Sequence, residues 1–141
     1  MIRTGWILGL LVIAACTSCQ WAGDTKAARV PFSALKQSLD DVNTRLTSAV
    51  QSGSSDQVPS LDKEMNAALD QIQSQSSAMN LMDREHLSIN VATARKCLSE
   101  LDRYASSGDQ DLLRAQLQQL GPTISEIDEL LDRTDRATRA P

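Results

Sequence analysis

The stretch 32-FSALKQSLDDVNTRLTSA-49 sets a pattern that the rest of the chain repeats. Its apolar side chains are spaced alternately three and four residues apart, which places them on one face of an α-helix. These side chains are Phe32, Leu35, Leu39, Val42, Leu46 and Ala49. Residues 52–55, Ser-Gly-Ser-Ser, then interrupt the pattern. The stretch therefore predicts an amphipathic helix that buries a single stripe.

Three further stripes of this kind follow, from Val58 to Met79, from Leu87 to Ala105 and from Leu113 to Leu131. Short polar breaks separate them, and helices joined by short connections are usually antiparallel neighbours. No stretch alternates between apolar and polar residues with a period of two, so no strand is expected. The predicted fold is all-α, an antiparallel up-down-up-down four-helix bundle over residues 32–136. The alternative is an arrangement of three longer helices, in which the second break is only a kink.

Polar residues and glycine mark the expected helix ends. Asp56 is a candidate N-cap for the second helix, where Pro59 is tolerated in the first turn because its missing N–H would be unpaired anyway. The third helix is expected to open near Asp83 and to close at Gly108, since glycine adopts the left-handed conformation without strain. Asp109 is the expected N-cap of the fourth helix.

The dipeptide Gly121-Pro122 lies inside the fourth stripe. Proline in a helix interior removes a backbone hydrogen bond and costs about 3 kcal/mol. The apolar spacing nevertheless continues through it, from Leu120 to Ile124. We expect a kinked, continuous helix, and the alternative is a break with a new helix that begins at Pro122.

Residues 13–16, Ile-Ala-Ala-Cys, end a short apolar run, Trp6–Ala15, that follows Arg3. The run is too short to span a bilayer, which needs about 20 apolar residues. This layout resembles a bacterial lipoprotein signal peptide, whose lipobox ends in a cysteine that becomes a thioether to diacylglycerol. The resemblance implies lipidation of Cys16 and attachment to a membrane through the acyl chains. Ordinary secretion and an uncleaved anchor are the alternatives, and Cys19 is a rival acceptor that lacks the aliphatic residue three positions before it.

The same resemblance implies the domain organisation and the location. Residues 1–15 would be the signal peptide, 16–31 the lipidated N-terminus and a flexible tether, 32–136 the bundle and 137–141 a frayed tail. In this family an aspartate directly after the acylated cysteine favours retention in the inner membrane, and here Thr17 follows. The resemblance therefore implies a lipid-anchored protein of the cell envelope, in the outer membrane and facing the periplasm.

The composition argues against several classes of partner. Fourteen basic residues face 18 acidic ones, and loss of Arg3 with the signal peptide would change the net charge from −4 to −5. A mildly acidic surface argues against nucleic-acid binding and against electrostatic docking to anionic lipid. The aromatic residues that remain are Trp21, Phe32 and Tyr104, which are few for a β-sandwich or a sugar-binding cleft.

Two residues could carry chemistry. His86 is the only histidine, so it cannot form a zinc or copper cluster by itself, and it is expected to be exposed in the first turn of the third helix beside Asp83 and Glu85. Cys97 is expected to be buried and inert at the edge of the core, and a disulfide with Cys19 or with a partner chain is the alternative. Cys-x-x-Cys, Glu-x-x-His and glycine-rich phosphate-loop motifs do not occur, so no thiol-redox, di-iron or nucleotide chemistry is indicated.

Other polar and soft side chains are interpreted structurally. The methionines at helical spacing, which are expected to fill the core, are Met65, Met79 and Met82. The carboxylates that are expected to form a solvated face are Asp40, Asp41, Glu64, Asp70, Glu126, Asp128 and Glu129. The basic residues that are expected to fray at the C-terminus are Arg133, Arg136 and Arg139.

From Asp56 to Ile72 and from Leu87 to Leu120, the rhythm of helix and turn is similar to that of the small periplasmic b-type cytochromes. Those proteins are four-helix bundles that hold haem between a methionine on the first helix and a histidine on the last. Here residues 32–51 contain no methionine and residues 109–136 contain no histidine. The resemblance therefore implies a fold and not a haem.

Together these features predict a non-enzymatic envelope lipoprotein with no catalytic residue, cofactor or metal site. Its bundle is expected to act as a helical interaction or structural module that contacts another envelope protein, with the membrane bound through Cys16. The alternative function is a periplasmic bundle that binds a small ligand or a metal.

Overall fold

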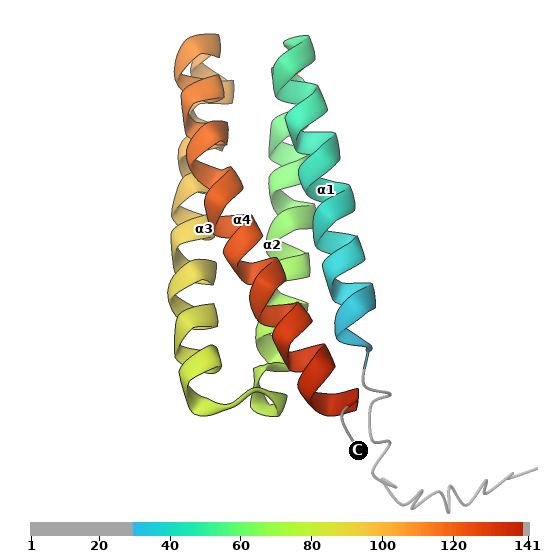
Figure 1. The fold of residues 1–141 in the computed structure, drawn as a ribbon. Coiled ribbons are helices and arrows are strands. Elements are labelled where there is room, and N and C mark those ends of the chain that lie inside the picture. Colours follow the sequence, from blue (N-terminus) through green and yellow to red (C-terminus); the bar gives the residue numbers. More distant parts are fainter. Residues whose placement is uncertain (1–29, 140–141) are drawn as a thin grey trace, which may run out of the picture.

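The computed structural model describes residues 30–139, which form four α-helices, two short 3₁₀ segments and no strand. The elements are α1 (Phe32–Ser52), η1 (Ser55–Gln57), α2 (Val58–Ser74), η2 (Ser76–Ala78), α3 (Leu81–Ser107) and α4 (Gln110–Arg139). Figure 1 shows each α-helix antiparallel to the next, in the order up, down, up, down. The predicted all-α, antiparallel four-helix bundle is confirmed.

The helices form a closed ring of neighbours. α1 packs against α2 and α4, and α3 packs against α2 and α4. α2 ends at Ser74, and a separate cap at Asn80 starts α3, so the alternative of three longer helices is wrong. The stripe predicted for the second helix continues past the end of α2, because Met79 in the connection still turns its side chain into the core.

The four predicted stripes meet in one apolar core. Every member of the first stripe is buried, and the central leucines Leu39, Leu46, Leu69 and Leu98 are fully enclosed. Removing one such side chain from water contributes about 1.5–3 kcal/mol, which is why the stripe spacing determines the packing. The outer faces are polar, and none of the helices in residues 30–139 combines the length and the apolar character needed to cross a membrane.

The two ends of the bundle are built differently and are called the glycine end and the terminal end. The glycine end holds the α1–α2 and α3–α4 turns, where Gly53 (φ 77°) and Gly108 (φ 73°) take the left-handed conformation. Ser54 N donates to the Ala49 carbonyl at 2.8 Å, which completes a Schellman turn after α1. The terminal end holds the first residues of α1, the α2–α3 connection and the last turns of α4 (Figure 1).

Side-chain caps set the helix starts, in part differently from the prediction. Asp109 Oδ1 accepts a hydrogen bond from Leu112 N at 3.1 Å, so the predicted N-cap of α4 is confirmed. Asp56 is not an N-cap, because it lies within η1 and α2 follows Gln57 without a side-chain cap. α3 begins at Leu81, since Asn80 Oδ1 accepts from Asp83 N at 2.9 Å and caps the helix before the predicted position.

α4 passes through Pro122 without a break, so the predicted continuity is confirmed, the alternative of a new helix at Pro122 is wrong, and the kink stays a prediction. Pro122 lies on the exposed face, so the Gln118 carbonyl that lacks its helical donor faces water. Gly121 has no Cβ to clash with the proline ring, which would otherwise disfavour a helical residue at that position. The helix then continues to Arg139, so residues 137–139 of the predicted frayed tail are helical.

Candidate functional site

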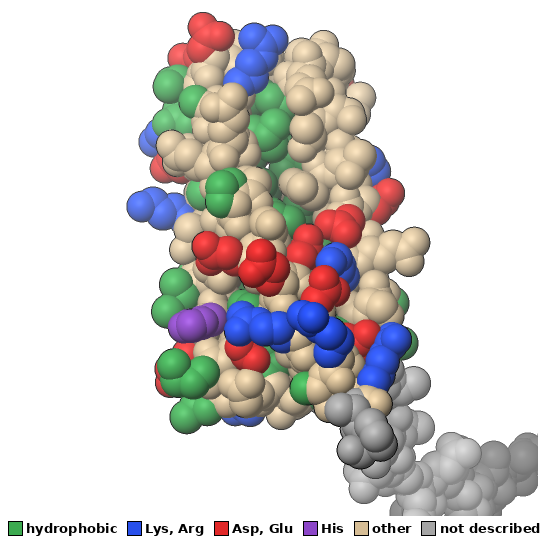
Figure 2. Space-filling model, in the orientation of Figure 1, with side chains coloured by type: hydrophobic (Ala, Val, Ile, Leu, Met, Phe, Trp, Pro, Cys, Tyr) green, Lys and Arg blue, Asp and Glu red, His purple; other side chains and the backbone are tan. Residues whose placement is uncertain are grey.

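A groove of about 360 Å³ lies between α3 and α4, towards the terminal end. Figure 2 shows this face, with the histidine among apolar side chains and a row of basic side chains beside it. The lining residues are His86, Ile89, Asn90, Glu126, Glu129, Leu130 and Arg133. The groove therefore joins an apolar floor to a charged rim.

The α3 side of the groove carries an apolar side chain that lies outside the core. Ile89 is 63 % exposed, whereas Leu87 and Val91 on either side of it are buried. The sequence carries a signal for this residue, because Ile89 is a large apolar residue off the predicted stripe, but no role was predicted for it. His86 is exposed, as predicted, although it lies in the second turn of α3 because that helix begins at Leu81.

The α4 side of the groove is fixed by an ion pair to α3. Arg133 Nη1 lies 3.3 Å from Asp83 Oδ1, and the Asp83 side chain is only 12 % exposed. Asp83 is held in turn by Asn80, whose Nδ2 donates to Asp83 Oδ2 at 2.7 Å. Arg133 was predicted to fray with the tail, and this is wrong because the ion pair and the buried Thr134 beside it hold that turn of α4 in place.

The remaining lining residues give the groove its chemical character. Leu130 is buried beneath it, and Glu126 and Glu129 are exposed on its α4 side, where the sequence predicts a solvated acidic face. Opposite charges therefore stand on one rim, with Arg133 nearer the terminal end and Glu126 nearer the middle of α4. Such an arrangement can orient a partner along the groove, because charge complementarity sets register and specificity.

A carboxylate pair lies between α1 and α4. Asp128 is half buried, and its Oδ1 atom is enclosed without a hydrogen-bond partner in residues 30–139. Burial, the charge of Asp40 and a hydrogen bond with the Asp40 carboxyl raise the pKa of Asp128 to about 7, although Lys36 acts in the opposite direction. Asp128 was predicted to belong to a solvated face, and this is wrong because the packing of α4 on α1 covers one side of its carboxylate.

An ion pair flanks these carboxylates. Lys36 Nζ donates to Asp132 Oδ2 at 2.7 Å, which links the first turns of α1 to the C-terminal part of α4. This hydrogen bond, together with the charges of Asp132, Asp128 and Asp40, raises the pKa of Lys36. The α1–α4 seam is thus a structural ion-pair region in which one carboxyl group titrates near neutral pH.

The soft side chains divide between the core and the surface. Met65 and Met79 are buried, as predicted, but Met82 is 61 % exposed because it lies in the first turn of α3, outside the stripe. Cys97 is a free, buried thiol.

The proposed lipidation residue Cys16 and the rival Cys19, which is also the alternative disulfide partner, lie outside the described residues. Within residues 30–139 no three His, Cys, Asp or Glu side chains gather where they could hold a metal ion.

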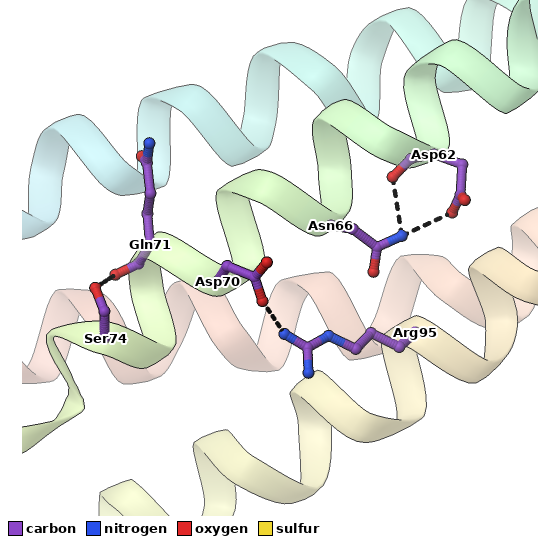
Figure 3. A network of polar contacts seen from close by, with 6 residues as sticks. All are labelled: Asp62, Asn66, Asp70, Gln71, Ser74 and Arg95. Carbon is purple, nitrogen blue, oxygen red and sulfur yellow. Dashed lines mark hydrogen bonds and ion pairs between the residues drawn. The ribbon is translucent and has the colours of Figure 1, made fainter.

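The α2–α3 face carries a polar network (Figure 3). Arg95 reaches from α3 to form an ion pair with Asp70 on α2. Asn66 Nδ2 donates to Asp62 Oδ1 at 3.1 Å, which partly offsets the rise that burial and the charge of Asp102 produce in the pKa of Asp62. The Arg95–Asp70 ion pair ties α3 to α2 on their solvent side, whereas the Asn66–Asp62 hydrogen bond lies within α2.

Comparisons with protein-family models, with characterised proteins and with solved structures give no match to this chain. The functional assignment therefore depends on the chain's own residues and geometry.

Proposed function

We propose that this protein is a lipid-anchored, non-enzymatic module of the bacterial cell envelope that binds another envelope protein through the α3–α4 groove. The anchor would be Cys16, for which the lipobox-like residues 13–16 are the support. The observation that carries the interaction function is Ile89, a large apolar side chain that is 63 % exposed on the groove's edge. Ile89 adjoins the apolar floor that Leu130 gives the groove, and apolar surface with a polar rim marks protein-interaction sites.

The groove fits an amphipathic helix better than a flat surface. An apolar stripe on the partner could pack on Ile89 and Leu130, since helices commonly bind in grooves through apolar residues spaced three or four apart. Basic side chains of the partner would face Glu126 and Glu129, and an acidic one would face Arg133. The proposed partner is therefore an envelope protein that presents such a helix.

The anchor is tested by the intact mass of the protein extracted from its native membrane. A mass that corresponds to residues 16–141 with acyl chains, and that is lost in Cys16→Ser, supports the anchor. An unmodified mass would place the protein free in the periplasm or the medium and would contradict this part of the proposal.

The interaction is tested with Ile89→Asp and a matched control, Ala67→Asp, on the exposed side of α2. Both positions are solvent-exposed and helical, so both variants are expected to fold. One specific protein should co-purify from native membranes with the wild type and with Ala67→Asp, and it should be lost with Ile89→Asp. Absence of a specific partner, or equal loss in both variants, would contradict the groove as the interaction site.

The size of the groove supports one alternative function, the binding of a small ligand. Pockets for small molecules usually hold about 300–1,000 Å³, and this groove is at the lower limit with about 360 Å³. His86 and Arg133 would supply hydrogen-bond donors to an anionic ligand. A rise in melting temperature with a small anion, abolished by Arg133→Gln, would favour this alternative over the protein partner.

A further inference from the structure

The terminal end of the bundle carries two neighbouring apolar side chains that no part of the described protein covers. Leu81 is 65 % exposed and Met82 is 61 % exposed, and they are the first two residues of α3. They directly follow the α2–α3 connection and belong to the first turn of α3, which lies at the terminal end (Figure 1).

This exposure is built into the fold. Asn80 caps α3 through Asp83 N at 2.9 Å, and Arg84 Nη2 donates to the Ser77 and Met79 carbonyls at 3.4 Å. The buried side chain of Met79 anchors the connection from the other side. The first turn of α3 is therefore held rigidly, with Leu81 and Met82 turned outwards.

The charges near this tip are compatible with an anionic surface. Acidic and basic residues are balanced in the first turns of α3 and the last turns of α4, and the guanidinium groups of Arg84 and Arg136 have no carboxylate partner within residues 30–139. At the glycine end acidic residues exceed basic ones. In the two turns of each helix next to the glycine end and in the connections there, the acidic residues are Asp56, Asp62, Glu64, Glu100, Asp102, Asp109 and Asp111, and the basic residues are Arg45, Lys63, Arg103 and Arg114.

The chain that precedes the bundle joins it at the same end. α1 begins at Phe32, at the same end of the bundle as the α2–α3 connection and the end of α4 (Figure 1). If Cys16 is lipidated, as proposed above, the residues between it and α1 can reach no more than about 50 Å at about 3.3 Å per residue. The anchor would thus hold Leu81 and Met82 close to a bilayer at a high effective concentration, where even a weak contact is well populated.

We propose that the terminal end rests on the phospholipid bilayer that holds the anchor, with Leu81 and Met82 inserted among the headgroups and Arg84 and Arg136 near the lipid phosphates. Apolar side chains on a polar element can enter the interface to a depth of about 5–10 Å, and long basic side chains extend towards the headgroups. This inference rests on the proposed anchor at Cys16.

A bilayer fits this tip better than a second protein does. A stable protein interface covers about 800 Å² on each partner, whereas two side chains on a convex turn offer far less. A bilayer needs only shallow insertion, because the acyl chains supply most of the binding free energy. The contact would set the bundle upright, with the glycine end pointing away from the membrane and the α3–α4 groove close to its surface.

The test uses the full-length protein, purified with its own acyl chains and reconstituted into vesicles of phosphatidylethanolamine and phosphatidylglycerol. An environment-sensitive fluorophore is placed at Met82→Cys or, as a matched control on the same helix, at Ser106→Cys at the glycine end, in a Cys19→Ser background. Cys97 is buried and is expected not to react. Lipids that carry a quencher near the headgroup should quench the probe at residue 82 and shift its emission to the blue, and they should leave the probe at residue 106 unchanged.

The outcomes separate this proposal from the proposed anchor. An acylated protein with an unquenched probe at residue 82 would overturn the bilayer contact and leave the anchor intact, whereas an unacylated protein would overturn both. Equal quenching at residues 82 and 106 would show a bundle lying flat and would also overturn the proposal. With the probe at Ser77→Cys, the double change Leu81→Asp and Met82→Asp should abolish quenching while circular dichroism shows an unchanged helix content, because both side chains are exposed.

Discussion

The chain reverses direction between helices at both the glycine end and the terminal end of this bundle, but the connections are built differently. At the glycine end, two left-handed glycines close short turns, and Leu112, at 46 %, is the one large apolar side chain that is clearly exposed there within the described residues. At the terminal end, the α2–α3 connection contains no glycine, the 3₁₀ segment η2 and the Asn80 cap make the reversal, and the apolar side chains of Leu81 and Met82 face solvent. The terminal end thus leaves more apolar surface available for contacts than the glycine end does.

The largest effect should come from truncating the core beneath the terminal end. Leu87→Ala is expected to lower the free energy of unfolding by about 2–5 kcal/mol, because Leu87 is fully buried and the change leaves a cavity. Ile89→Ala, two residues further along α3, should change it by less than about 0.5 kcal/mol because that side chain is mostly in water. Urea denaturation of both variants measures the difference, and equal losses would mean that Ile89 has a structural role.

The turns at the two ends should differ in their tolerance of substitution. Gly108→Ala is expected to cost about 1–2 kcal/mol, because a Cβ is strained at φ 73° even though no neighbouring atom lies within 4 Å of it. Ser77→Ala in the turn at the terminal end should cost less than about 0.5 kcal/mol, since its side chain is exposed. Thermal unfolding followed by circular dichroism compares the two, and a similar cost at Ser77 would remove the distinction between the turns.

Asp128, which lies in the half of α4 nearer the terminal end, should make the free energy of unfolding depend on pH. Its folded-state pKa is raised to about 7 from an ordinary value of 3.8, so the folded protein keeps a proton that the unfolded chain releases between these values. The contribution of Asp128 to the free energy of unfolding is therefore fully present below pH 3.8. It falls as the pH rises towards 7 and stays constant above pH 7. Because the group is only half buried, solvent screening limits the loss to on the order of 1 kcal/mol.

The variant Asp128→Asn isolates this contribution. It should raise the free energy of unfolding at pH 8 by on the order of 1 kcal/mol, leave it nearly unchanged at pH 4 and reduce its dependence on pH between these values. Asp41→Asn is the matched control for the loss of one carboxylate, because Asp41 is exposed on α1. Denaturation curves across this pH range test the prediction, and a profile unchanged by Asp128→Asn would contradict it.

The smallest effect is expected between the two ends, on the α2–α3 face. Arg95→Ala removes the ion pair with Asp70 (Figure 3) and should change the free energy of unfolding by less than about 0.5 kcal/mol, because the Asp70 side chain is 70 % exposed and that of Arg95 is 39 % exposed. The change should become smaller still at high salt, which screens exposed charges. A loss above 1 kcal/mol in urea denaturation would show that the solvent faces contribute as much as the turns do.

Most of the fold could be predicted because its information is local. The three-and-four spacing of the apolar residues identified the four helices, and the polar breaks predicted their antiparallel order. Asp109 was identified as a cap because its side chain acts on a backbone N–H three residues away. Asn80 was missed because the apolar stripe of the third helix starts only at Leu87, while the helix itself starts at Leu81.

The candidate site could not be predicted in the same way, because its residues come from two helices. His86, Glu126, Glu129 and Arg133 each looked like an isolated surface residue in the sequence, and packing of α3 against α4 brings them to one groove. Ile89 carried a signal as an apolar residue off the stripe, but its neighbours could not be known without the structure.

By itself, the sequence determined which residues form helices and which side of each helix is buried, because helix periodicity depends only on the spacing along one chain. It also carries the lipobox-like segment from which the membrane anchor is proposed. Only the tertiary structure decided that α1 shields the Asp128 carboxylate from part of the solvent and that Arg133 pairs with Asp83. It also decided that Leu81 and Met82 lie at the same end of the bundle as the start of α1. The physical reason is that burial, charge pairing and pKa depend on distances between helices, which the order of residues within a single helix does not encode.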